Sequence, residues 1–64
     1  MPSETEWLDI VVKVDRPLAV LVNNGAIDVW LPKSQIIDSY DELGEGVATK
    51  IELPIWLLEE KGLV

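Results

Sequence analysis

The sequence predicts a mainly β fold with four to five strands and a short C-terminal helix, arranged as a small curled antiparallel sheet or as an SH3-like or OB-like barrel. Apolar and polar residues alternate in several short runs, turn residues separate these runs, and a proline precedes the last apolar run. A chain of 64 residues has room for one domain. Within it we expect residues 1–6 to be flexible and residues 38–46 to form an acidic loop. The sheet and the barrel bury the same alternate residues, so the pattern fits both.

The alternation begins at residues 7–14, which form the first predicted strand. Asp, Arg and Pro at residues 15–17 make the turn that follows. The next strand, residues 18–22, is apolar on both faces, which favours a central position in the sheet. The expected core face of the first strand consists of Leu8, Ile10, Val12 and Val14.

A hairpin is expected at Asn24 and Gly25, because both residue types tolerate the positive φ that a two-residue type I′ turn needs at its two central positions. The third strand then covers residues 26–31, and Trp30 should point away from the core. The core face of this strand consists of Ile27, Val29 and Leu31.

Pro32 should end the third strand, since proline cannot donate a hydrogen bond to a ladder. Ser34 either caps a short helical turn or leads into a fourth extended segment at residues 35–38. After the acidic loop, alternation returns at residues 47–53 and predicts the last strand.

The C-terminal helix should start with Pro54 at its first position, where a missing N–H group does no harm. Gly62 supplies the positive φ that ends many helices, and Leu63 can make the hydrophobic contact that often follows such an ending. The expected apolar side of the helix consists of Ile55, Trp56, Leu57 and Leu58.

Composition excludes several kinds of function. The chain contains no cysteine and no histidine, so disulfides are absent and sites for zinc, haem or iron–sulfur clusters are disfavoured. The only serines are Ser3, Ser34 and Ser39, and none has an evident general base. We therefore predict a protein that is not an enzyme and that needs no cofactor.

The charge balance favours a protein partner. Twelve acidic residues against five basic ones give a net charge of −7, which opposes direct binding to nucleic acid or to anionic membranes and favours a basic protein surface. No apolar run approaches the roughly 20 residues needed to cross a bilayer. Residues 1–6 are polar and acidic, unlike a secretory signal, so a cytoplasmic location is expected.

The turn after the third strand is the first candidate site. Lys33 and Ser34 can hold an anion beside a helical turn, or they can serve as a solvated turn residue and a cap. Trp7 and Trp30 both lie on the face opposite the expected core. The favoured interpretation is that the C-terminal helix buries them, and the alternative is a patch for a partner.

The acidic loop is the second candidate site. Its carboxylates lack the ligand spacing of a calcium loop, so a solvated loop or a mimic of nucleic-acid phosphates is expected rather than a metal site. The carboxylates are Asp38, Asp41, Glu42 and Glu45.

The run Trp-Leu-Pro-Lys-Ser at residues 30–34, the run Leu-Pro-Ile-Trp-Leu at residues 53–57 and the Lys-Gly-Leu ending resemble a set of short phage and mobile-element proteins. The resemblance covers most of residues 18–64 and carries no established active site. It implies counter-defence, nucleic-acid mimicry or modulation of a host enzyme, with the host cytoplasm as the location.

These observations predict a small acidic protein-binding modulator that inhibits a larger protein by covering a basic surface. The alternative is a small-ligand or nucleotide-binding module that uses the turn at residues 30–34, with the pocket at the subunit interface of a homo-oligomer. The candidate partner-binding residues are Trp30, Lys33, Ser34, Tyr40, Asp41, Glu42 and Glu45.

Overall fold

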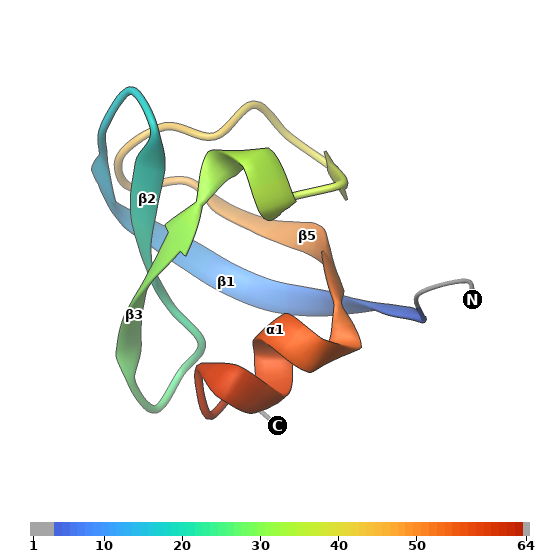
Figure 1. Ribbon diagram of the computed structural model, residues 1–64. Helices are drawn as coiled ribbons and strands as arrows, with labels where there is room; N and C mark the ends of the chain where they lie inside the picture. The colour runs from blue at the N-terminus through green and yellow to red at the C-terminus, as the bar shows by residue number, and fades with distance from the viewer. Residues whose placement is uncertain (1–3, 64) are drawn as a thin grey trace.

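The computed structural model describes residues 4–63, which form one antiparallel sheet and a short C-terminal helix (Figure 1). The strand order is β3-β2-β1-β5-β4, and no pairing joins the two edge strands within this part of the chain. The mainly β prediction is confirmed, and the sheet is open rather than a closed barrel. The elements are β1 (Thr5–Asp15), β2 (Ala19–Asn23), β3 (Asp28–Pro32), the 3₁₀ helix η1 (Lys33–Gln35), β4 (Asp38–Ser39), β5 (Ala48–Pro54) and α1 (Ile55–Glu60).

The long strand β1 starts earlier than predicted, since Thr5 and Glu6, which we expected to be flexible, already pair with β5. Glu4 O also accepts a hydrogen bond from Ile55 N at 3.0 Å, and only residues 1–3 of that expected flexible segment lie outside the described residues. β1 occupies the centre of the sheet and pairs with both β2 and β5. β2 lies between β1 and β3, in agreement with the prediction of an internal strand.

A β-bulge near the end of β1 changes the face that its last residues occupy. Val12 pairs with Val22, but the next pair is Val14 with Leu21, so one extra residue is accommodated between them. Val14 therefore leaves the core face, and its predicted place in the core is wrong. Asp15 takes that face instead, opposite the fully buried Val20.

The β2–β3 hairpin differs from the predicted two-residue type I′ turn. The last paired residues are Asn23 and Asp28, which leaves the four-residue loop 24–27. Gly25 has a φ of 100°, whereas no described residue other than glycine has a positive φ, so Asn24 lacks the conformation that type I′ requires. The physical reason lies in the Asn24 side chain, whose Oδ1 accepts hydrogen bonds from two backbone N–H groups of the loop at 2.9 Å each.

This longer loop also removes Ile27 from β3 and leaves it 42% exposed, so its predicted place on the core face is wrong. Beyond the strand, the cap position of η1 is Pro32 and no side chain caps the turn, so the prediction of Ser34 as a cap is also wrong. The ladder continues past the proline, because Lys33 N donates to Leu18 O at 2.9 Å. The predicted bounds of the fourth extended segment, residues 35–38, are wrong, because Gln35 belongs to η1 and the strand is the two-residue β4, which pairs with β5.

The helix α1 begins at Ile55, while Pro54 ends β5 and occupies the cap position rather than the first helical turn. Its C-terminal end is as predicted. Gly62 has a φ of 72° and donates to Glu59 O at 3.2 Å, and Leu63 N donates to Leu58 O at 2.8 Å. These two bonds form a Schellman motif, which turns Leu63 back into the core with 7% of its surface exposed.

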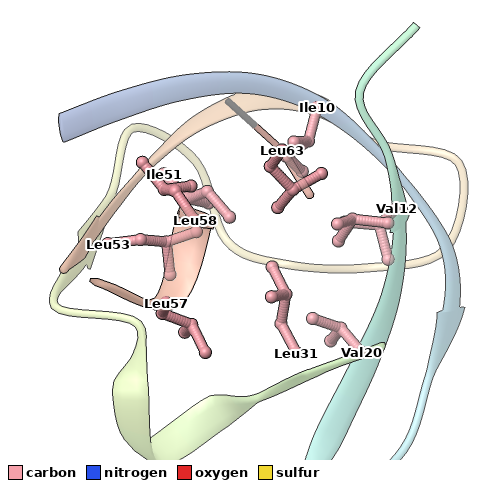
Figure 2. Packing of buried hydrophobic residues seen from close by; sticks show 10 residues of the cluster. Ile10, Val12, Val20, Leu31, Ile51, Leu53, Leu57, Leu58 and Leu63 are labelled. Carbon is pink, nitrogen blue, oxygen red and sulfur yellow. The ribbon is translucent and has the colours of Figure 1, made fainter. Parts of the chain in front are cut away.

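The core lies between the inner face of the curled sheet and α1, and Figure 2 shows its side chains converging there. The inner face supplies β-branched and leucine side chains from β1, β2, β3 and β5, and the helix and its end supply three leucines. The described core residues are Ile10, Val12, Val20, Val22, Leu31, Ile51, Leu53, Leu57, Leu58 and Leu63.

All three tryptophans lie outside this core. Trp7, Trp30 and Trp56 are 41%, 46% and 50% exposed. The favoured expectation that α1 buries Trp7 and Trp30 is wrong, because α1 packs on the opposite face of the sheet through its leucines. Among the described residues, no helix has the length and apolar character to cross a membrane.

Candidate functional site

The outer face of the sheet carries a groove of about 510 Å³. Paired residues of the two central strands, Val11 of β1 and Ala48 of β5, form its floor. The β2–β3 loop lines one side, and Tyr40 and Asp41, which follow β4, line the other. Segments far apart in the sequence therefore meet around a short apolar floor.

The wall formed by Tyr40 is braced by Trp7. Their ring centroids are 5.0 Å apart and the ring planes meet at 65°, an edge-to-face arrangement that aromatic pairs prefer. Tyr40 is held next to β5 because its backbone N donates to Lys50 O at 2.9 Å. Tyr40 is 68% exposed, so most of its surface remains open to a partner.

Charged groups border the same groove. Asp9 and Lys50 are opposite one another on β1 and β5, and Asp9 Oδ1 lies 2.9 Å from Lys50 Nζ. The hydrogen bond to Asp9, followed by the attraction of its negative charge, raises the pKa of Lys50. Asp41 is exposed on the groove wall and forms no salt bridge with any residue between 4 and 63. The groove therefore combines the ring of Tyr40, which Trp7 supports, with one paired and one unpaired carboxylate.

Lys33 lies elsewhere and already has a partner. Its Nζ lies 2.6 Å from Asp15 Oδ1, and both side chains are about one-third exposed, at 34% and 36%. The β-bulge in β1 makes this contact, because it moves Asp15 to the face that η1 approaches. Ser34 is exposed and is not a helix cap. The anion site at this turn stays a prediction, in which an anion would have to compete with Asp15 for the lysine.

The acidic loop is tied to the sheet at several points, and in Figure 1 it runs as a yellow segment from β4 toward β5. Asp41 N donates to Thr49 Oγ1 at 3.1 Å, and Gly46 N donates to Val12 O at 2.8 Å. Glu45 Oε2 accepts a hydrogen bond from Asp15 N at 3.2 Å, which gives this carboxylate a structural contact. Within the described range, no three metal-ligating side chains are grouped to hold a metal ion.

The predicted partner-binding residues do not form one patch. Tyr40 and Asp41 share the groove, whereas Lys33 and Glu42 line a separate depression of about 470 Å³ beside η1 and β4. Trp30 lies on β3, at the opposite edge of the sheet from β4. Only two of the predicted residues therefore belong to the outer-face groove.

Sequence reasoning placed neither Asp9 nor Lys50 in a candidate site, and it considered Trp7 only as part of a partner patch with Trp30, the less favoured of its two interpretations. The available signal was their outward parity within alternating strands. What the sequence lacked was the pairing of the first strand with the last, which places Asp9 opposite Lys50 and brings Trp7 close to Tyr40.

The chain matches no protein-family model, no curated protein and no solved structure. The resemblance to short phage and mobile-element proteins therefore stays a prediction.

Proposed function

We propose that this chain is a non-enzymatic protein-binding module that holds a basic segment of a larger protein in the outer-face groove. The observation that carries the proposal is the exposed Trp7–Tyr40 pair beside the exposed Asp41 carboxylate. Exposed aromatic residues of this kind are typical of interfaces. The net charge of −7 attracts a basic partner over a longer range.

An arginine side chain fits the chemistry of the groove. Its planar guanidinium can lie against the face of Tyr40, where the ring quadrupole attracts a cation. Asp41 can accept its N–H groups, and Asp9 becomes available if Lys50 moves aside. A bound basic segment would be covered, so the proposal includes inhibition of a partner that uses this segment to bind nucleic acid. The proposal also includes that the inhibited partner is a host enzyme and that the two proteins meet in the cytoplasm.

The test uses a nine-residue peptide with three arginines and a second peptide in which neutral citrulline replaces each arginine. We expect the arginine peptide to bind and to shift the NMR signals of Tyr40 and of the Trp7 indole N–H group. The citrulline peptide should bind at least about tenfold more weakly, because it keeps the shape and loses the charge.

Tyr40→Ala should also lower the affinity about tenfold or more. Trp56→Ala is the matched control, since Trp56 is an exposed aromatic residue on α1, away from the groove. Equal affinity for the two peptides, or equal losses in the two variants, would contradict the proposal.

A further inference from the structure

The β3 strand is an edge of the sheet whose second side is unpaired. β2 is its only partner strand among residues 4–63. At the other edge, β4 has only two paired residues and the acidic loop continues beside β5, whereas β3 has five. An edge strand can pair with another strand, because it presents unused N–H and C=O groups.

The hydrogen bonds on either side of β3 establish which backbone groups face this free edge. Lys33 N donates to Leu18 O at 2.9 Å, and Asn24 N donates to Ile27 O at 3.2 Å. Hydrogen-bonded pairs alternate with non-hydrogen-bonded pairs along an antiparallel ladder. Counting residue pairs inward from either bond assigns the same residues of β3 to the free edge. The residues whose backbone groups face the free edge are Asp28, Trp30 and Pro32.

We propose that β3 pairs antiparallel with β3 of a second copy of this chain, with Trp30 opposite Trp30 of that copy, so that two five-stranded sheets join into one of ten strands. Such a pairing is isologous, since the same patch is used twice about a two-fold axis. The two tryptophans exchange two N–H to C=O bonds. Asp28 N donates to Pro32 O of the second copy, and the symmetric bond completes four.

The side chains of β3 favour this register over those centred on Asp28 or on Pro32. Centring the pair on Asp28 would place two carboxylates opposite each other, which is destabilising. Centring it on Pro32 would remove the central donors, since proline has no N–H group. With Trp30 at the centre, two half-exposed indoles meet on the outer face and each Asp28 lies opposite a proline. Aromatic residues directly opposite each other stabilise a strand pair.

A second copy would also cover a large side chain that folding leaves exposed. Trp30 is 46% exposed next to its paired neighbour Leu21 on the outer face, and the dimer would cover it. Pro32 is tolerated in the β2–β3 ladder, because a backbone N–H group at this position would face the free edge and not β2. The dimer must overcome repulsion between two chains of net charge −7, so added salt should strengthen it.

The experiment measures self-association of the full chain by analytical ultracentrifugation over a range of protein and salt concentrations. We expect wild type to dimerise, and Trp30→Lys and Trp30→Glu to weaken the dimer about tenfold or more, because like charges then lie opposite each other. An equimolar mixture of the two variants should recover the dimer as a heterodimer, since each lysine then faces a glutamate. Only a register that places position 30 opposite itself gives this recovery.

Ile37→Lys is the matched control, since Ile37 is a 55% exposed apolar residue near the opposite edge of the sheet. It should dimerise as wild type does. Circular dichroism confirms that each variant folds, and Trp30→Thr, which suits a strand, replaces any variant that does not. A wild-type chain that stays monomeric up to about 1 mM overturns the proposal. So does a dimer that Trp30→Lys leaves intact, or a mixture without heterodimer. The groove residues are unchanged throughout, so this result is independent of arginine binding.

Discussion

The two faces of the sheet use large side chains in different ways. The inner face and the buried side of α1 bury leucine, isoleucine and valine almost completely, and the core that they form contains no tryptophan. The outer face carries Trp7 and Trp30, each more than two-fifths exposed, and Tyr40 lies beside Trp7. A domain of this size gains most of its stability from a small core, so large aromatic rings left outside it add little to folding.

This difference separates residues that maintain the fold from residues available to partners. Adjacent residues of β3 make the contrast sharpest, because Leu31 is 0% exposed and Trp30 is 46% exposed. An inner-face change should act on the free energy of unfolding. An outer-face change should act on binding and leave that free energy nearly unchanged.

The largest expected effect is on the inner face. Leu31→Ala should lower the free energy of unfolding by about 2 to 5 kcal/mol, since it removes buried methyl groups and leaves a cavity. Trp30→Ala should cost much less, because the ring already contacts water. Urea titrations of both variants give the comparison. Similar losses would mean that the two faces contribute equally to stability.

A smaller effect is expected where the chain returns Leu63 to the inner face. Gly62→Ala should cost about 1 to 2 kcal/mol, because an L-residue resists the φ of 72° while its Cβ meets nothing within 4 Å. Gly44→Ala is the control, since Gly44 has no positive φ and its added Cβ would make an ordinary contact at 3.8 Å with Val47. Thermal melts of the two variants test this, and equal midpoints would argue against a strained C-terminal turn.

The sequence was sufficient for these inner-face features because each depends on local pattern. The alternation identified Ile10, Val12 and Leu31 as core residues, and Gly62 with Leu63 identified the helix end. These signals need no knowledge of which strands pair.

The errors lie where the structure depends on distant partners or on side-chain hydrogen bonds. The bulge that moves Val14 outward and Asp15 inward is a matter of register with β2, and alternation alone assumes a regular strand. The Asn24 side chain bonds the loop in place of the predicted turn. The groove required the β1–β5 pairing, so only Tyr40 and Asp41 of its residues were anticipated as a site.

The smallest effects on the free energy of unfolding are expected from removing either of two ion pairs, one on each face of the sheet. Asp15→Asn should lower the free energy of unfolding by roughly 0.5 to 1 kcal/mol, because its pair with Lys33 is partly shielded yet still about one-third exposed. Asp9→Asn on the outer face should leave the urea midpoint unchanged at pH 7, since Asp9 is 79% exposed in its pair with Lys50.

The pH dependence of the outer pair supplies a second measurement. Folding raises the pKa of Lys50, chiefly through its hydrogen bond to Asp9, so the folded state holds this proton more tightly than the unfolded state. Any stabilisation is complete below the ordinary lysine pKa of about 10.4 and is lost as the pH rises through the higher folded value. Any stability that wild type has over Asp9→Asn should therefore be constant from about pH 6 to pH 9 and disappear only at more alkaline pH. A clear difference in the free energy of unfolding at neutral pH would show that this outer-face pair stabilises the fold. The distinction between an inner face that stabilises the fold and an outer face that does not would then be wrong.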